Sequence, residues 1–297
     1  MAATWEGRTR GTPLGYRIFI WLLRHGGLAA AYALLPLVTL YYRLFVPSAT
    51  TPLKALYRDR LGFDAATARR LIRKNLTVFG QTLIDKVAVL AGAGGRLSFT
   101  HDGGPEHIAA MIQAGQGGFI ISAHLGNWEV AGHMLQRYNG VINILMYDGE
   151  GEQIKTLMER YNSKRSFNII YVKEAGDHIY EITAALRRNE LICLHADRFR
   201  PGARTITHPF LGADADFPAG PFIMASKLHA PVCFVFAFKG GKYHYHFSAE
   251  PARLYTGRGM EGANAMLDDY ITLLEKELKL HPEQWFNYYD FWLQPRP

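Results

Sequence analysis

The residues whose types and spacing can do chemistry lie in the segment GGFIISAHLGNWEVAGHML. An apolar run ends at Ala123, His124 follows directly, and Gly126 and Asn127 precede Glu129. In one continuous helix, a separation of five residues would place His124 and Glu129 about 140° apart. We therefore predict a strand-to-helix turn with Asn127 as N-cap, across which Glu129 reaches back to the imidazole. The carboxylate would fix the imidazole tautomer, and His124 would act as a general base.

The nucleophile of such a reaction is expected to come from the substrate. Ser122 belongs to the other face of the strand, so neither a serine nor a cysteine stands in a suitable place beside His124. The two cysteines, Cys193 and Cys233, lie in apolar runs and are interpreted as small buried residues, which fits a reducing compartment. A hydroxyl of the substrate would then attack an acyl group directly, without an acyl-enzyme.

The twelve histidines of the chain raise the question of a metal site. The spacings HExxH and CxxC and that of a facial triad do not occur, so no metal is predicted. His244 and His246 share one face of a strand and are interpreted as surface residues, with cation binding as the alternative. His195, beside Asp197 at the end of a strand, is the other histidine that we expect near His124.

Short apolar runs that alternate with helical patterns predict an α/β fold with a mostly parallel central sheet flanked by helices. The predicted strands cover residues 119–123, 142–146, 169–172, 191–195, 232–238 and 243–247, the last two joined as a hairpin. The predicted helices cover residues 105–115, 128–138, 150–165, 177–189, 219–229 and 260–280, and a long amphipathic helix runs from about residue 65 to the glycines at 92, 94 and 95. Ligands of such sheets bind beyond the carboxyl ends of the strands.

The positive charge of the chain is concentrated near its start. The formal net charge is +7, but residues 1–74 hold twelve Lys and Arg against three Asp and Glu, a net +9, and the remaining residues sum to −2. Such a segment favours a polyanionic partner, either nucleic acid or an anionic membrane surface. Because no helix-turn-helix, zinc-finger or RNA-recognition pattern appears, we do not expect nucleic acid as the partner.

An apolar stretch within the same basic segment favours the membrane. Eighteen residues between Arg24 and Arg43 carry no Lys, Arg, Asp or Glu. As a helix they would span roughly 27 Å, slightly less than a bilayer core of about 30 Å. We predict an N-terminal membrane-anchor helix, either a short span or a helix in the interface, with a signal peptide and a buried core helix as alternatives.

The sequence HLGNWE resembles the H-x4-[D/E] signature of the lysophospholipid and glycerolipid acyltransferase superfamily. Its NWE ending is similar to the branch of lipid A late (lauroyl or myristoyl) acyltransferases. The resemblance extends to the N-terminal hydrophobic helix and to LICLHADR, PFLGADADFPAGP, APVCFVF and HPEQWF. It implies residues 1–60 as a basic membrane-anchoring segment, residues 61–297 as the α/β acyltransferase domain, and a location on the cytoplasmic face of a bacterial inner membrane.

The resemblance also implies a reaction and its participants. An acyl carrier protein or coenzyme A thioester would donate a fatty acyl chain to a lipid hydroxyl, with no metal and no bound cofactor. His124 and Glu129 would be catalytic, and Asn127, Asp197 and Arg198 would contact substrate. The helix that begins in the turn around Gly220 would offer N–H groups to an anion or a developing oxyanion.

Several alternatives stay open at this point. Asp148, Glu150 and Glu152 stand where many lipid A acyltransferases carry an arginine. The acceptor can therefore be lipid A, an ornithine or glycine lipid, or a polyene-type glycolipid. A non-catalytic membrane lipid-binding protein and a lipase or thioesterase are the remaining hypotheses.

Overall fold

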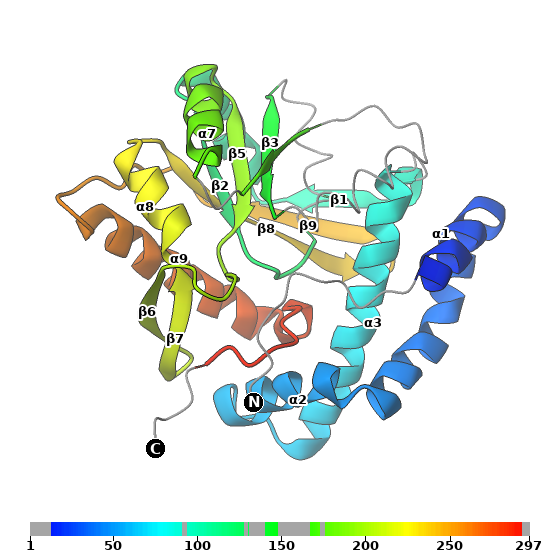
Figure 1. Ribbon diagram of the computed structural model, residues 1–297. Coiled ribbons are helices and arrows are strands. Elements are labelled where there is room, and N and C mark those ends of the chain that lie inside the picture. Colours follow the sequence, from blue (N-terminus) through cyan, green and yellow to red (C-terminus); the bar gives the residue numbers. More distant parts are fainter. Residues whose placement is uncertain are drawn as a thin grey trace.

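The computed structural model describes residues 13–90, 94–127, 130, 140–147, 167–172 and 176–292 (Figure 1). Helices α1 (Pro13–Phe45), α2 (Pro47–Ala55) and α3 (Ala65–Leu90), with a π-helical turn at Leu56–Arg60, precede the sheet. The strands are β1 (Ser98–His101), β2 (Gly118–Ser122), β3 (Ile142–Met146), β4 (Asn168–Tyr171), β5 (Leu191–His195), β6 (Thr205–Phe210), β7 (Ala213–Pro218), β8 (Val232–Gly241) and β9 (His244–Ala249). The later helices are α4 (Gly104–Gln113), α7 (His178–Arg187), α8 (Ala219–Lys227) and α9 (Glu261–Leu280), with short 3-10 turns at Gly94–Arg96 and Pro282–Gln284.

Seven strands form one central sheet in the order β1-β9-β8-β2-β5-β3-β4. All neighbouring pairs are parallel except β8 and β9, which form the predicted hairpin. The prediction of an α/β fold with a mostly parallel sheet is confirmed. Strand β2 lies at the centre between β5 and β8, and this arrangement brings the carboxyl ends of β2 and β5 to the same edge.

Strand β8 shows how the core is divided between the two faces of the sheet. Phe234, Phe236 and Phe238 belong to the large cluster that also includes residues of α7, α8 and α9. Cys233 and Val235 belong to a second cluster with residues of α4. Alternate residues of a strand point to opposite faces, so the continuous apolar run of β8 serves two helical layers.

The predicted strands agree with β2, β3, β4, β5, β8 and β9 to within a few residues at their ends. The long amphipathic helix is confirmed as α3, and α4, α7, α8 and α9 are confirmed as well. The predicted helices over residues 128–138 and 150–165 lie almost entirely outside the described residues. Strand β1 and the separate hairpin β6–β7 were not predicted.

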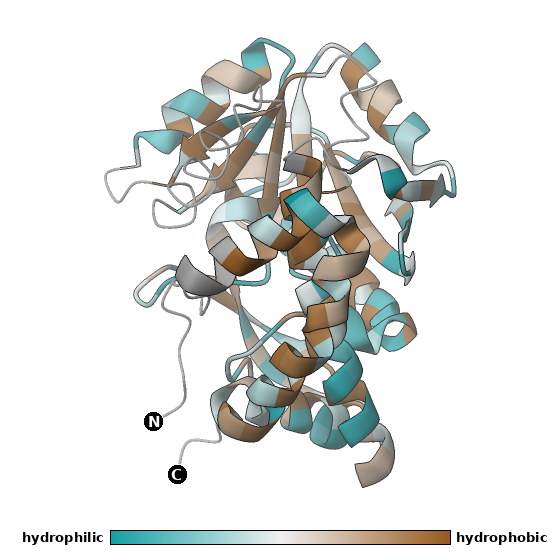
Figure 2. Cartoon of the chain, turned by 90° about the vertical axis from the view of Figure 1, so that its right-hand side faces the viewer, coloured by the Kyte–Doolittle hydropathy of each residue, from teal (hydrophilic) through white to brown (hydrophobic). Residues whose placement is uncertain are grey.

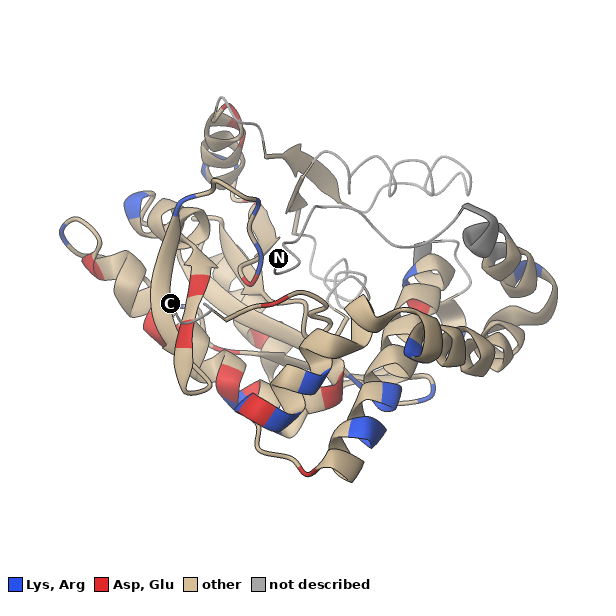
Figure 3. Ribbon diagram, turned by 60° about the horizontal axis from the view of Figure 1, so that its bottom comes forward, with Lys and Arg blue, Asp and Glu red and all other residues tan. Residues whose placement is uncertain are grey.

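The three N-terminal helices form an arm beside the α/β body (Figure 1). Helix α1 packs along α3 and contains a break at Gly27, whose φ is 66°. By length and composition, Trp21–Phe45 is long and apolar enough to cross a membrane. Figure 3 places basic residues on α2 and α3 and acidic residues on β7 and α9. The charge division of the sequence is therefore a division in space.

Candidate active site

His124 and Asp197 meet because β2 and β5 are parallel neighbours. Ser122 pairs with His195 at the carboxyl ends of these strands. His124 and Asp197 each follow two residues later, so both leave the sheet at the same edge. The prediction that Asp197 opens on the edge that carries His124 is confirmed by this register.

The side chains of His124 and Asp197 form a short hydrogen-bonded pair. His124 Nδ1 lies 2.7 Å from Asp197 Oδ1, and the backbone N–H of His124 donates to Oδ2 at 2.9 Å. The indole Nε1–H of Trp285 donates to the same Oδ2 at 3.0 Å. Asp197 is 1% exposed, whereas the His124 side chain is 23% exposed. The carboxylate is thus enclosed, and the imidazole retains access to solvent.

The protonation state of Asp197 follows from its surroundings. Burial alone would raise the pKa of this carboxyl, but the charge and hydrogen bond of His124, with the nearby Arg198 guanidinium, hold the pKa well below its usual range. An ionised Asp197 can only accept hydrogen bonds, so His124 carries hydrogen on Nδ1, and in the neutral ring the lone pair is on Nε2. This is the tautomer that a general base at Nε2 needs.

His195 forms one wall beside the base, as the sequence indicated. Its ring centroid lies 4.1 Å from that of His124, with the planes inclined by 50°. Burial lowers the pKa of His195 well below the usual value, and the proximity of His124 acts in the same direction. A neutral His195 therefore packs against His124 without competing for its proton.

A carboxyl-terminal segment closes around this pair. The backbone N–H of Phe286 donates to the His124 carbonyl at 2.8 Å, and Arg198 donates to the Phe286 carbonyl at 2.5 Å. The hydroxyl of Tyr289 donates to the Asp197 carbonyl at 2.8 Å. The resemblance drew attention to HPEQWF but predicted no contact for it. Nothing in the pattern of these residues indicates that they return to β2.

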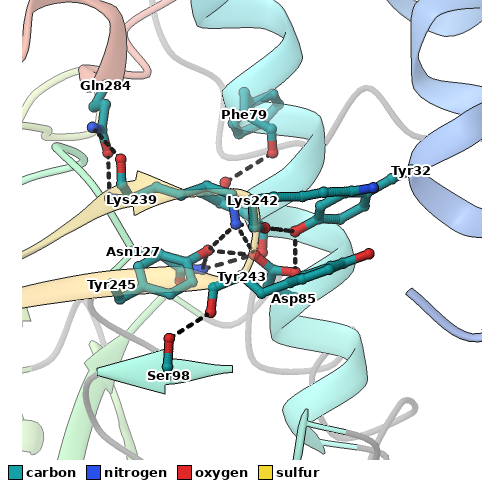
Figure 4. Close-up of polar contacts among 11 residues, drawn as sticks. Tyr32, Phe79, Asp85, Ser98, Asn127, Lys239, Lys242, Tyr243, Tyr245 and Gln284 are labelled. Carbon is teal, nitrogen blue, oxygen red and sulfur yellow. Dashed lines mark hydrogen bonds and ion pairs between the residues drawn. The ribbon is translucent and has the colours of Figure 1, made fainter. Parts of the chain in front are cut away.

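Asn127 is buried among structural partners. Its side-chain Nδ2 donates to the Thr82 carbonyl and to the Tyr245 hydroxyl, each at 3.2 Å, and its backbone N–H donates to the Ala237 carbonyl at 2.7 Å. These contacts connect the turn after His124 to α3 and the β8–β9 hairpin (Figure 4). The amide thus holds this turn, and its contact with substrate stays a prediction.

The remaining predicted residues lie in different places. Arg198 is held beside His124 by its bond to Phe286. Gly220 lies in the first turn of α8, where a Cβ would meet nothing within 4 Å. Glu129 lies outside the described residues, and so do Asp148, Glu150 and Glu152. Asp197 already bonds Nδ1 of the His124 ring. The ring nitrogen that remains for the predicted contact with Glu129 is Nε2.

Other chemistry-bearing residues have structural surroundings. Cys193 and Cys233 are free and buried, and burial raises the pKa of each thiol to about 12, which keeps them protonated and unreactive. His244 contacts Ser98 and Thr100 at the β1–β9 edge, at 2.9 Å in each case. Within the described ranges, His, Cys, Asp and Glu side chains form no group suited to a metal ion.

The protein is an α/β protein with a mostly parallel sheet, and an imidazole oriented by a carboxylate lies where the parallel strands end. Such an imidazole can activate a hydroxyl of a bound substrate. The family follows from the sequence: residues 61–296, about four fifths of the chain, match the family described as bacterial lipid A biosynthesis acyltransferase. The chain belongs to this family and is an acyltransferase of the lipid A type. A comparison with curated proteins finds no match.

Proposed function

We propose that this enzyme transfers a fatty acyl chain from a thioester of acyl carrier protein, or of coenzyme A, to a hydroxyl of a membrane lipid. The observation that carries the proposal is the 2.7 Å contact between His124 Nδ1 and Asp197 at the carboxyl edge of the sheet. It supports a base of the right tautomer at a place where ligands of parallel sheets bind.

In the proposed step, His124 Nε2 takes the proton of the acceptor hydroxyl as its oxygen attacks the thioester carbonyl carbon. The new C–O bond forms, the C–S bond breaks, and the departing thiolate receives the proton from the imidazolium. Asp197 stabilises the imidazolium while it exists. The steps balance without a covalent acyl-enzyme and without a bound cofactor.

We assign the orienting role to Asp197. Glu129 was predicted for that role, and its participation stays a proposal to be tested separately. If Glu129 alone orients the base, Glu129→Gln will reduce kcat as strongly as His124→Ala, and Asp197→Asn will leave kcat unchanged. If Asp197 orients it, Asp197→Asn will have the large effect.

Arg198 and the start of α8 at Gly220 are proposed to bind the polar parts of the substrates. Arg198 is tied to the backbone that encloses His124, which supports a place for its charge near the reacting groups. Backbone N–H groups in the first turn of a helix favour an anionic oxygen. A role at the reacting carbonyl would make these N–H groups an oxyanion site.

The acceptor is proposed to be a lipid A precursor, in keeping with the family, with ornithine or glycine lipids and polyene-type glycolipids as alternatives. We place the enzyme on the cytoplasmic face of the inner membrane, where acyl thioesters are available. The apolar helix α1 and the basic arm support a membrane partner. Comparison of lipids from source cells with and without the gene would identify the acceptor.

The test of the reaction is transfer of a labelled acyl group from purified thioester donors to extracted lipids. Removing a positioned base should reduce kcat about 10²- to 10⁴-fold, so His124→Ala should be nearly inactive but folded. His244→Ala is the control, because its strand β9 lies two places from β2 in the sheet. Full activity of His124→Ala would refute the proposal. Thioester loss that needs no lipid acceptor would favour a thioesterase, and lipid binding without thioester consumption would favour a binding protein.

A further inference from the structure

Helix α1 has two faces with different surroundings. Leu28, Ala31 and Leu35, spaced three and four residues apart, are buried in a cluster with Ile84 and Val87 of α3. This spacing is that of one helix face. The inner face of α1 is therefore fixed on the catalytic body over about two turns.

A buried polar contact ties the middle of α1 to the body. The hydroxyl of Tyr32 donates to Asp85 Oδ1 at 2.5 Å and also contacts the Lys242 carbonyl at 3.1 Å (Figure 4). Lys239 Nζ lies 2.6 Å from Asp85 Oδ2, and Tyr245 donates to the same oxygen at 2.6 Å. Asp85 is fully buried, so its charge depends on these partners.

This tie decides how α1 can meet a membrane. Tyr32 lies near the middle of the eighteen-residue stretch between Arg24 and Arg43. If the stretch crossed a bilayer, Tyr32 would lie in the hydrocarbon core and would bring Asp85 and Lys239 with it. The exposed Lys242, whose carbonyl contacts the Tyr32 hydroxyl, would be drawn in with them, and an exposed charge at that depth is strongly unfavourable. A transmembrane α1 is incompatible with the packing that the structure shows.

The outer face of α1 is apolar and uncovered. Its large exposed side chains, of which Phe45 is the most accessible at 70%, are Ile18, Trp21, Leu37, Leu40, Tyr41, Leu44 and Phe45. Figure 2 looks onto this side of the molecule and shows apolar residues along much of α1. Five of them gather between Leu37 and Phe45, after the break at Gly27, and Leu37, Tyr41 and Leu44 follow one another at helical spacing. A stripe of this kind marks an interaction surface, unlike single exposed apolar residues.

The charges around the stripe identify its partner. The segment from Pro13 to Ala55 contains four Lys and Arg and no Asp or Glu. Arg24 and Arg43 are exposed at the two ends of the uncharged stretch. An apolar face bordered by cations and flanked by aromatic rings matches the headgroup region of an anionic lipid layer.

We propose that α1 lies flat in the surface of one anionic leaflet, with its outer face among the upper acyl chains and its inner face still bound to α3. The enzyme is then monotopic, and both ends of α1 lie on the same side of the membrane. The proposal rests on the proposed function for its lipid partner. It decides between the span and the interfacial helix that the sequence alone left open.

The first test is flotation of the full-length protein with vesicles. Phosphatidylcholine vesicles that contain phosphatidylglycerol should bind it more tightly than phosphatidylcholine alone, and binding should weaken with salt. Leu37→Glu/Leu44→Glu should reduce binding about tenfold or more, because two leucines that would insert among the acyl chains become charged. The control is Leu254→Glu, since Leu254 is 56% exposed and Leu44 is 58% exposed. Unchanged binding of the double variant would overturn the proposal.

The second test measures topology in sealed membranes. Cysteines introduced as Arg24→Cys and Arg43→Cys should react with a membrane-impermeant thiol reagent in the same preparation, either spheroplasts or inverted vesicles. Cys193 and Cys233 are buried, so the unmodified chain serves as the blank. The proposal is overturned if the two cysteines react from opposite sides of the membrane. It is also overturned if either cysteine is unreactive in both spheroplasts and inverted vesicles.

A third measurement tests whether a second copy of the chain covers the stripe. The lipid-free protein would then be a dimer, and Leu37→Glu/Leu44→Glu would be a monomer that still floats with vesicles as the wild type does. In that case a second chain covers the stripe, and the proposal fails. Flotation requires neither an acyl donor nor an acceptor. If the protein transfers acyl groups but does not float with vesicles, the proposal for α1 fails and the proposed function stands. If it floats but transfers no acyl group, the proposed function fails and the proposal for α1 stands.

Discussion

At the scale of single residues, the site is organised by one buried carboxylate. Asp197 accepts hydrogen bonds from the His124 ring, the His124 backbone and Trp285. Three donors around one ionised group fix both its charge and its direction. The His124 ring is therefore held in one tautomer and one orientation before a substrate arrives, which is the preorganisation that a general base requires.

The first prediction concerns this orientation. Asp197→Asn keeps the size of the side chain but removes the charge, so the imidazolium formed during transfer loses its partner. We expect kcat to fall about 10²- to 10⁴-fold with a smaller change in the KM of the acceptor. Steady-state transfer assays would measure both constants. Trp285→Phe keeps the His124–Asp197 contact. If it lowers kcat as much as Asp197→Asn does, the loss comes from altered packing and not from the missing charge.

The same residue makes stability depend on pH. The pKa of Asp197 is lowered in the folded chain, so its contribution to stability is present above the ordinary carboxyl pKa and is lost as pH falls further. Between about pH 5 and pH 3, the unfolding free energy of the wild type should fall faster than that of Asp197→Asn, approaching about 1.4 kcal/mol per pH unit. Urea unfolding of both proteins at several pH values would measure the difference. Parallel curves would contradict the lowered pKa.

Gly126 is the second residue on which the position of His124 depends. Its φ is 81°, and a Cβ at this position would collide with the carbonyl oxygen of Ala237. Gly126→Ala should destabilise the fold by at least about 2 kcal/mol and displace the turn after His124. Gly95→Ala is the control, because a Cβ there meets nothing within 4 Å. Equal unfolding free energies of the two variants would show that the turn tolerates a side chain.

At the scale of elements, a buried ion pair joins α3 to the β8–β9 hairpin. Burial lowers the pKa of Lys239, and Asp85 at 2.6 Å opposes this effect. The backbone of Lys239 is also fixed, because its N–H donates to Gln284 Oε1 and its carbonyl accepts from Gln284 Nε2. The cluster thus connects the N-terminal arm, the hairpin and the segment that encloses His124.

Removing one charge of the Lys239–Asp85 pair should lower the unfolding free energy more than removing both charges. Lys239→Met leaves Asp85 buried without a counter-charge and should lower the unfolding free energy by about 3–5 kcal/mol. Adding Asp85→Asn removes that charge and should recover a large part of the loss. Denaturant unfolding of the two single variants and the double variant forms a double-mutant cycle. Strictly additive losses would mean that the two charges are not coupled.

Most of the sheet could be predicted from sequence, because its strands are buried on both faces. Runs such as Val232–Phe238 are apolar at successive positions, and only double burial explains that pattern. Strand β1 escaped prediction because it is an exposed edge with the sequence SFTH. Among the strands that the structure describes, β6 and β7 pair with each other and with no other strand, and β7 has one further bridge from Ala215 to Trp292. Their stability comes from the hairpin and its packing, which local patterns do not reveal.

The site was predictable in part, for a related reason. His124 and Asp197 could be expected at one edge because each follows a buried strand. Their pairing required the order β2-β5, which no local pattern contains. The contacts of Trp285 and Phe286 with these residues span many positions in sequence and depend on how the chain returns after α9. The predicted contact of Glu129 was a local inference, and it stays a prediction.

At the scale of the whole molecule, the active site has a fixed relation to the basic arm. Helix α3 packs against α1 on one side, and on the other side its Thr82 carbonyl accepts a hydrogen bond from Asn127. Acidic residues lie on β7 and α9 of the α/β body (Figure 3). An anionic surface would therefore attract one end of the molecule and repel the other, which orients the enzyme before contact.

This orientation predicts a difference between acceptors in a membrane and acceptors in solution. Leu37→Glu/Leu44→Glu weakens docking but leaves His124 and Asp197 unchanged, so transfer to a short-chain, water-soluble acceptor should keep the wild-type kcat and KM. Transfer to the same headgroup embedded in anionic vesicles should lose about tenfold in kcat/KM or more, because less enzyme is bound at the surface. Parallel assays with Leu254→Glu control for the added charge. If both acceptors lose activity equally, the outer face of α1 acts on the chemistry itself, and placement of the active site at the membrane is not its role.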